Sequence, residues 1–315
     1  MITCQKLFNK PNKLLRFTGL TVNQYQVLVE RLIPLWEAAE FKRLWHMDRK
    51  RAIGAGRRYT IEKLEDKLLL ILIWYRTYSV YELLAWIFQL DAVNVGRLIK
   101  KLIPLVEQAA DPELLSYLQS ARTKRKKIRT WDEFVEEFPD MAEVIIDATE
   151  QRRKRPTNNR KQKHVYSGKK HAHTFKTQIT ASIRGRILDV SKSYPGRIHD
   201  KTILDKEQTL KRLPKQTRKR LDKGYDGVIQ EHPKSHLILP YKRRRNSPPL
   251  SRGQKQANTL RAKQRVVGEH VIARIKKYPI ISDKYRSGES DYNQHFRNIV
   301  ALCNFRLLFK EKYDT

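Results

Sequence analysis

Three acidic residues stand at positions that could hold metal ions: Asp147, Asp222 and Glu269. Asp147 ends the apolar run 144–146, Asp222 lies in the basic stretch 218–223, and Glu269 lies in a segment with helical periodicity. Carboxylates are hard oxygen ligands, which suit Mg²⁺ or Mn²⁺. Two such ions can promote cleavage of a phosphodiester, because one activates the attacking hydroxyl and the other stabilises the leaving oxygen.

Each carboxylate also has an ordinary structural explanation. Asp147 could cap the turn after a strand. Asp222 could pair with a neighbouring lysine, and Glu269 could pair with Arg265 one helical turn earlier. Taken singly, each explanation competes with metal binding, whereas metal binding accounts for all three residues at once.

The elements that must position these residues predict an α/β fold. Short apolar or alternating runs predict five strands, at residues 143–147, 174–181, 186–191, around 221 and at 237–239. Gly185 between the second and third runs predicts a hairpin. Helices are predicted over residues 199–213, 262–277 and 290–310. The three carboxylates can then converge where strands one and four are neighbours, with Glu269 on the helix after the fifth strand.

The first 120 residues are predicted to be helical. A helix over residues 21–39 has Thr21 as its cap, and further helical patterns follow at 60–75, 80–88 and 92–102. Thr60 is expected to cap the first of these three. Their short connections predict a helix-turn-helix at about residues 60–104, whose last helix would enter the major groove of DNA. An ordinary helical bundle is the alternative, since no base-contacting residue can be read from the pattern.

The charge of the chain favours a polyanionic partner. The 315 residues include 66 Lys and Arg against 33 Asp and Glu, a formal net charge of +33, and each neutralised phosphate of a nucleic acid releases condensed counterions. Only Cys4 and Cys303 occur, which argues against a disulfide framework or a cysteine zinc site. No segment has the features of a signal peptide or a membrane span. We therefore expect a cytoplasmic protein that binds nucleic acid.

The basic run at residues 121–129 separates the helical pattern from the strands. We expect a helical DNA-binding domain over residues 1–120, a basic linker over 121–140 and a catalytic domain over 141–315. Two later basic runs leave predicted strand ends close to the proposed ligands, and they are expected to hold DNA phosphates without reading sequence; solvated, disordered loops are the alternative. These runs contribute Arg152, Arg153, Lys154, Arg155, Lys169, Lys170, Arg243, Arg244 and Arg245.

Four segments, in this order, resemble the DDE transposases of bacterial insertion sequences. They are YSGKKHAHTFKTQ at residues 166–178, PGRIHD at 195–200, LDKGYDG at 221–227 and the helix that runs from RVVGE at 265–269 to Lys276. The similarity covers about residues 145–277. It points to the insertion-sequence-five-like family, which is related to Harbinger transposases and the nucleases derived from them.

The resemblance implies an RNase H-like catalytic domain with a mixed five-stranded sheet and flanking helices, preceded by an all-α helix-turn-helix domain. It assigns the catalytic, metal-binding triad to Asp147, Asp222 and Glu269, with two Mg²⁺ or Mn²⁺ ions. Asp200 is the main rival for the second position, because His199-Asp200 is itself a family motif. Asp222 is preferred because the strand order places it on the fourth strand, whereas Asp200 starts a helix.

Other motif residues are expected to assist the triad. The family pattern around the glutamate matches Arg265 and Lys276, whereas Ala262 departs from it, since the family has tyrosine at this position. By the same resemblance, His173 is expected beside the site, where it could contact phosphate or position water. A histidine at a solvated strand end is the ordinary alternative.

The resemblance further implies a transposase that binds the ends of its insertion sequence and catalyses metal-dependent cleavage and transfer of double-stranded DNA. Since two ends must be brought together, we expect a homodimer or a larger assembly on DNA, associated with the bacterial nucleoid. The alternatives are a Harbinger-like nuclease without strand transfer and a domesticated, non-catalytic DNA-binding protein.

Overall fold

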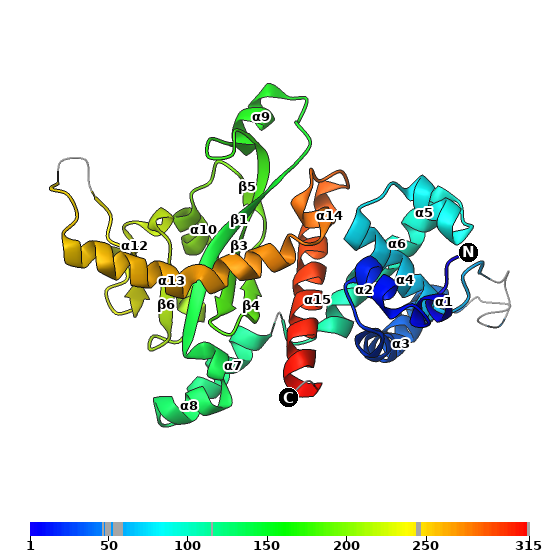
Figure 1. Cartoon of the computed structure of the whole chain (residues 1–315), viewed down its shortest axis with the longest axis horizontal. Coiled ribbons are helices and arrows are strands. Elements are labelled where there is room, and N and C mark those ends of the chain that lie inside the picture. The colour runs from blue at the N-terminus through cyan, green and yellow to red at the C-terminus, as the bar shows by residue number, and fades with distance from the viewer. Residues whose placement is uncertain (46, 48–51, 53–58, 115, 244–246, 314–315) are drawn as a thin grey trace. The chain divides into compact units, whose positions relative to one another are not determined.

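The computed structural model of the chain describes all residues except 46, 48–51, 53–58, 115, 244–246 and 314–315. The chain forms two compact units (Figure 1). Unit 1 comprises Met1–Pro112, Lys277–Ser282 and Gln294–Thr315, and unit 2 comprises Glu113–Lys276 and Asp283–Asn293. These units differ from the division expected along the sequence, because the end of the chain groups with the N-terminal helices.

Among the residues described, unit 1 contains helices and loops but no strands. Its helices are α1 (Cys4–Phe8), α2 (Pro11–Thr18), α3 (Val22–Leu44), α4 (Leu64–Thr77), α5 (Tyr81–Phe88), α6 (Ala92–Ala110), α14 (Pro279–Ser282) and most of α15 (Tyr292–Tyr313). The predicted cap Thr21 is confirmed, since its hydroxyl accepts the N–H of Gln24 at 3.3 Å. The predicted cap Thr60 is wrong, since α4 begins at Leu64 with Lys63 at its N-cap. The buried Ile61 lies before the helix, in a non-helical segment.

Helix α15 joins unit 1 through buried polar side chains. The amide of Asn298 donates to Tyr75 Oη at 2.7 Å and to the carbonyl of Ile103 at 2.8 Å. Near the other end of the contact, Asn304 donates to Asp111 Oδ2 at 2.7 Å. Burying an amide side chain is unfavourable unless the amide finds hydrogen-bond partners, and here these partners lie in α4, in α6 and directly after α6. The last helix therefore completes the core that α4 and α6 begin.

Unit 2 contains a mixed sheet of seven strands within the residues described. The strands are β1 (Glu143–Arg152), β2 (Tyr166–Ser167), β3 (Ala172–Ser182), β4 (Ile187–Val190), β5 (Tyr194–Pro195), β6 (Arg218–Leu221) and β7 (Leu237–Ile238). β3 pairs antiparallel with β1 on one edge and with β4, β5 and β2 on the other, whereas β6 pairs parallel with both β1 and β7. The five predicted strands are present, whereas β2 and β5 were not predicted.

The helices of unit 2 were predicted only at residues 199–213 and 262–277, and four further helices among the described residues were not predicted. The helices of this unit are α7 (Tyr117–Arg125), α8 (Trp131–Glu137), α9 (Asn159–Val165), α10 (Asp200–Lys206), α11 (Thr209–Arg212), α12 (Val228–Glu231) and α13 (Arg252–Ile275), with short 3-10 turns η1 (Pro139–Met141), η2 (Lys223–Tyr225) and η3 (Glu289–Asp291). The predicted helix over 199–213 is split where Gln208 takes a positive φ of 49°. α13 begins earlier than expected because Ser251 and Gln254 form a capping box.

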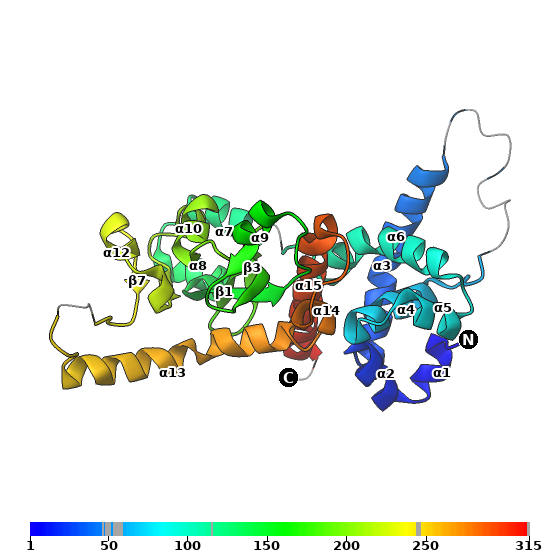
Figure 2. The ribbon, with the colours of Figure 1, turned by 90° about the horizontal axis from the view of Figure 1, so that it is seen from above.

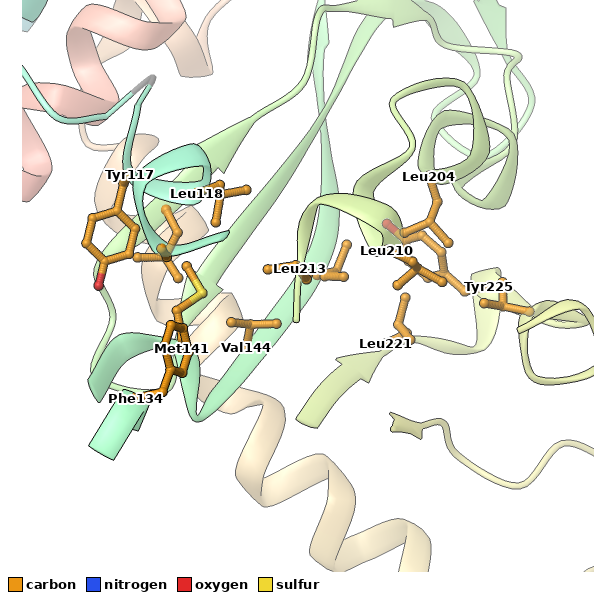
Figure 3. Packing of buried hydrophobic residues seen from close by; sticks show 14 residues of the cluster. Tyr117, Leu118, Phe134, Met141, Val144, Leu204, Leu210, Leu213, Leu221 and Tyr225 are labelled. Atoms are coloured by element: carbon orange, nitrogen blue, oxygen red, sulfur yellow. The ribbon is translucent and has the colours of Figure 1, made fainter. Parts of the chain in front are cut away.

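Residues 121–140, expected as a linker, instead belong to the core of unit 2. Ala121 of α7 and Phe134 of α8 are completely buried in a cluster that also contains Val144 and Ile146 of β1. Figure 3 shows Phe134 beside Met141 and Val144 in this cluster. Most basic side chains of the segment are exposed, but the guanidinium of Arg125 lies over the rings of Trp131 and Phe134 and packs with the apolar residues. The basic composition of the run therefore did not reveal that the segment belongs to a core.

The sheet of unit 2 lies between two helical layers. α7, α8 and α10 cover one face and α13 runs along the other (Figure 2). Because side chains alternate along a strand, Val144 and Ile146 point into the first layer, whereas Ile145 meets α13. No helix in the described parts of the chain is long and apolar enough to cross a membrane.

Candidate active site

The parallel pairing of β1 and β6 brings Asp147 and Asp222 together. Ile146 of β1 and Leu221 of β6 form the last pair of this ladder, so Asp147 and Asp222 are the residues that follow this pair in the two segments. Asp147 lies within β1, which continues to Arg152, and Asp222 is the N-cap of η2 directly after β6. The expectation that Asp147 ends its strand is therefore wrong, and so is the turn-capping explanation of this residue.

Helix α13 brings Glu269 to the same place by crossing β1 closely. A Cβ atom on Gly268 would lie 2.9 Å from Ile145 Cγ2, a distance that packed side chains do not tolerate. The absence of a side chain at Gly268 therefore allows the helix to approach the strand beside Asp147. Glu269 follows on the helix, and its side chain is 63% exposed.

One guanidinium stands among the three carboxylates. Arg265 Nη1 lies 3.7 Å from Asp147 Oδ2, and Arg265 Nη2 lies 3.6 Å from Asp222 Oδ1 and 3.7 Å from Glu269 Oε1. These separations exceed the length of an N–H···O hydrogen bond. Arg265 therefore acts as a shared positive charge rather than as the dedicated partner of Glu269, and the three predicted residues meet around it.

Burial disfavours the charged form of Asp147. Desolvation raises the pKa of Asp147, and the nearby charges of Asp222 and Asp200 raise it further. The N–H of Ala148, which donates to Asp147 Oδ1 at 2.8 Å, and the charge of Arg265 lower it. A carboxylate held in this way gains from any additional cation.

The explanation of Asp222 by a neighbouring lysine does not fit Lys219. The Lys219 ammonium is buried and donates to the carbonyls of Pro214 at 2.7 Å, Lys215 at 3.2 Å and Thr217 at 2.8 Å. Burial lowers the pKa of Lys219 to about 8. This lysine holds the turn before β6, and so it positions Asp222 indirectly.

The donor set of the three carboxylates fits hard divalent cations, because it consists of oxygen alone. Within the described residues, the group whose ligand atoms all lie within 4.8 Å of one another is a different one: Asp205, Glu231 and His232. Lys201 Nζ already lies 2.6 Å from Glu231 Oε1 and 3.7 Å from Asp205 Oδ2. Lys201 thus offsets one of the two negative charges of that surface cluster, which no sequence pattern predicted.

Asp200, the rival second ligand, is held by a buried lysine. Lys176 Nζ lies 3.0 Å from Asp200 Oδ1 and 3.4 Å from Glu150 Oε1, and it donates to the carbonyl of Ile198 at 2.8 Å. Asp200 is in the first turn of α10, and the N-cap is His199. A Cβ on Gly224 would lie 2.9 Å from Asp200 Oδ2, so the second and third sequence motifs touch.

The remaining accessory residues lie around this centre. His199 and Lys169 line a hollow of about 440 Å³ that also contains Lys176 and Asp200. His173 packs edge-on against Tyr166 at 5.6 Å between ring centroids, and partial burial, with Arg155 and Arg153 nearby, lowers its pKa. Burial and Lys170 lower the pKa of Lys276, whereas Glu150 and Asp147 raise it, which places its ammonium within the field of the site.

The basic residues expected to hold DNA differ in their availability. Six of them are exposed: Arg152, Lys154, Arg155, Lys169, Lys170 and Arg243. Arg153 is not, since its guanidinium lies 4.3 Å from the centre of the Phe175 ring and pairs with Glu289. Burial also lowers the pKa of Arg153. Arg244 and Arg245 lie outside the described residues.

Comparison with known proteins agrees with this geometry. A family sequence model described as "DDE superfamily endonuclease" matches residues 146–304, half of the chain. The chain is also 26% identical over 264 residues to the "Probable transposase for insertion sequence element IS702" of Microchaete diplosiphon, covering 84% of this chain and 87% of that protein. No solved structure matches the chain significantly. With its candidate site inside the matched region, the chain belongs to the DDE superfamily endonucleases.

Proposed function

We propose that the protein is a transposase that binds the ends of its insertion sequence and catalyses metal-dependent cleavage and transfer of DNA strands. The observation that carries the proposal is the meeting of Asp147, Asp222 and Glu269 around Arg265, from elements far apart in the sequence. The family match and the transposase relative support it. Double-stranded DNA is the proposed substrate, and a homodimer or larger assembly would hold two ends at once.

The three carboxylates would hold two Mg²⁺ or Mn²⁺ ions, which would supply charge neutralisation and a more acidic attacking water when bound. Asp147 is fixed within β1 and is the least accessible of the three, whereas Glu269 is exposed enough to adjust its position. The charge of Arg265 opposes the rise in pKa that burial causes at Asp147, and so favours the anionic form of that carboxylate. The exposed lysines 169 and 170 would hold phosphates beside the site.

In the proposed reaction, water attacks a phosphodiester at the end of the element and breaks the bond to the 3′ oxygen. The free 3′-hydroxyl then attacks a phosphodiester of the target, which forms one new P–O bond and breaks another. The site lies in the bacterial cytoplasm in this proposal, where both DNA molecules are found.

We propose that the catalytic part of unit 2 is RNase H-like. The support is the order of its longer strands, in which β1 lies between the antiparallel β3 and the parallel β6. Three consecutive strands pair antiparallel before a helical crossover leads to the two parallel ones. This arrangement supports a position of Asp147, on β1, beside Asp222, which directly follows β6.

We also propose that α4 to α6 form a helix-turn-helix with α6 as the helix that enters the major groove. Val95, Ile99 and Leu102 bury one face of α6. On the other face Asn94 and Arg97 are exposed, and Arg97 Nη1 donates to Asn94 Oδ1 at 3.4 Å. Amide and guanidinium groups in this setting suit the edges of adenine and guanine.

The test uses purified protein, Mg²⁺ and DNA that carries the ends of the element. We expect nicking at the ends and joining of the free 3′ end to a second DNA. Asp147→Asn should abolish both steps and leave binding in EDTA unchanged. Cleavage without joining would identify a nuclease instead, and binding without cleavage by the unaltered protein would identify a non-catalytic DNA-binding protein.

A further inference from the structure

The first two helices surround a hollow of unit 1 with basic side chains. Leu7 and Phe17 contribute apolar surface to this cavity of about 400 Å³. Four exposed cations line it, namely Lys6, Lys10, Lys13 and Arg16. No residue before Glu30 is acidic. Within the part of the chain that the structure describes, none of the four cations takes part in an ion pair. We call this hollow the basic groove.

The backbone beneath the basic groove is fixed to the core. Leu7 is 4% exposed and Leu14 is completely buried. The N–H of Cys4 donates to Asp66 Oδ1 at 2.7 Å, which ties α1 to α4. Thr3 caps α1. Lys6, Lys13 and Arg16 are thus displayed on formed helices and Lys10 at the N-cap of α2, so a ligand would not have to order a loose tail on binding.

Four exposed cations without acidic neighbours form a favourable site for a polyanion. A membrane surface and a nucleic acid both offer repeated phosphates. A helix that binds membranes presents a broad apolar face for insertion. Here Leu7 and Leu14 are buried in the protein, and α2 exposes two large apolar side chains, Leu15 and Phe17, each by 38%. A row of cations along a hollow fits a phosphodiester backbone better than it fits a lipid surface.

The basic groove borders the proposed helix-turn-helix. The N–H of Ile2 donates to the carbonyl of Ile87 at 3.4 Å, so the chain enters α1 beside the end of α5. We propose that the basic groove binds the phosphate backbone of double-stranded DNA without reading its sequence. The proposal relies on the proposed function only for the choice of DNA, and it adds a binding surface outside the helix-turn-helix and the basic runs of unit 2.

The test measures binding rather than cleavage. Fluorescence anisotropy of a labelled 30-base-pair duplex of arbitrary sequence is followed in EDTA between about 50 and 200 mM salt, with the full-length protein. The variant replaces all four cations: Lys6→Gln, Lys10→Gln, Lys13→Gln and Arg16→Gln. Its matched control removes three lysines and one arginine that are already within 4 Å of a carboxylate: Arg43→Gln, Lys63→Gln, Lys124→Gln and Lys201→Gln.

Each lost phosphate contact should reduce the slope of log K against log salt by about 0.9. We therefore expect the groove variant to lose roughly 2–4 units of slope and about 100-fold in affinity at low salt, and the control to lose less than about one unit. Equal slopes for the two variants would overturn the proposal. The two halves of the groove variant, tested separately with a thermal melt of each, guard against an effect of misfolding.

Two other outcomes separate this proposal from its alternatives. If the unaltered protein sediments with phosphatidylserine vesicles, and the groove variant loses this binding but keeps its DNA slope, the ligand is a membrane and the proposal is wrong. If the unaltered protein cleaves DNA and the groove variant binds it like the control, only the groove proposal fails. Absence of any DNA binding by the unaltered protein would overturn the proposed function as well.

Discussion

Asp147 is the least accessible of the three carboxylates around Arg265, with 18% of its side chain exposed against 36% for Asp222 and 63% for Glu269. Its charge is unfavourable in the metal-free protein, because burial raises its pKa. Sites that are built for chemistry often reduce stability in this way. The same residue should therefore report on both stability and activity.

We expect Asp147→Asn to stabilise the metal-free protein. The pKa of Asp147 lies above its ordinary value of 3.8, so the native state keeps a proton that the unfolded chain loses, and the free energy of unfolding from this group falls as pH rises through the folded pKa. Asparagine does not ionise. The difference in Tm should thus be small near pH 4 and grow toward pH 7, reaching about 2–4 °C for a gain of about 1 kcal/mol.

Calorimetry in EDTA at several pH values measures this difference. Glu269→Gln is the matched control, since its carboxylate is mostly exposed and should leave Tm nearly unchanged. A stabilisation by Asp147→Asn that is the same at all pH values would show that ionisation is not its cause.

Substitutions of Asp222 and of Asp200, the two candidates for the second ligand, should have different effects on metal binding. Asp222→Asn is expected to abolish Mn²⁺ binding and cleavage, because Asp222 shares Arg265 with Asp147. Asp200→Asn should keep Mn²⁺ binding and lose about 10–100-fold in activity, because Asp200 acts through Lys176. Titration calorimetry with Mn²⁺ and the nicking assay check both variants. The reverse pattern would make Asp200 the second ligand.

At the scale of elements, the crossing of α13 over β1 decides where Arg265 and Glu269 stand. Gly268→Ala would place a methyl 2.9 Å from Ile145 Cγ2, and overpacking of this kind costs about 1–3 kcal/mol. We expect lower stability and slower cleavage, as α13 is displaced. Ile145→Ala in the same chain removes the clash and should restore part of both, as a double-mutant cycle of Tm and rate would measure. Strictly additive effects would contradict this account.

The meeting of the three carboxylates could be predicted because each lies in a local pattern and the strand order implies that β1 and β6 are neighbours. Their common partner Arg265 was expected for Glu269 alone, since helical spacing is visible in a sequence and contacts across a sheet are not. The link from Lys176 to Glu150 and Asp200 depends on the register of β3 and on a loop. No local pattern encodes it.

At the scale of the whole molecule, the two units do not follow the chain. Residues 121–140 looked like a linker because six of the nine residues at 121–129 are basic, while Ala121 and Phe134 are residues that pack. Likewise, the helical pattern near the end of the chain could be predicted, but not the unit it completes. The buried amide of Asn298 bonds to residues that lie 223 and 195 positions earlier in the sequence, and no local pattern predicts such contacts.

Asn298→Ala should destabilise unit 1 and leave unit 2 unchanged. The substitution leaves Tyr75 Oη and the carbonyl of Ile103 without their amide donor, which costs about 1–3 kcal/mol. Hydrogen exchange should therefore accelerate in α4 and α6 but not in β1 or β3. Lys310→Ala, exposed on the same helix, is the control. Equal acceleration in both units would show that the two unfold together.

The place of α15 in unit 1 has a consequence during synthesis. A ribosome makes α4 and α6 long before residues 294–313, and all of unit 2 is made before Asn298 and Asn304 can reach their partners in unit 1. A chain released early would lack this closing helix. If unit 1 binds DNA as proposed, a chain without α15 would not bind the ends of the element. Such truncated chains would therefore not compete with chains that contain α15.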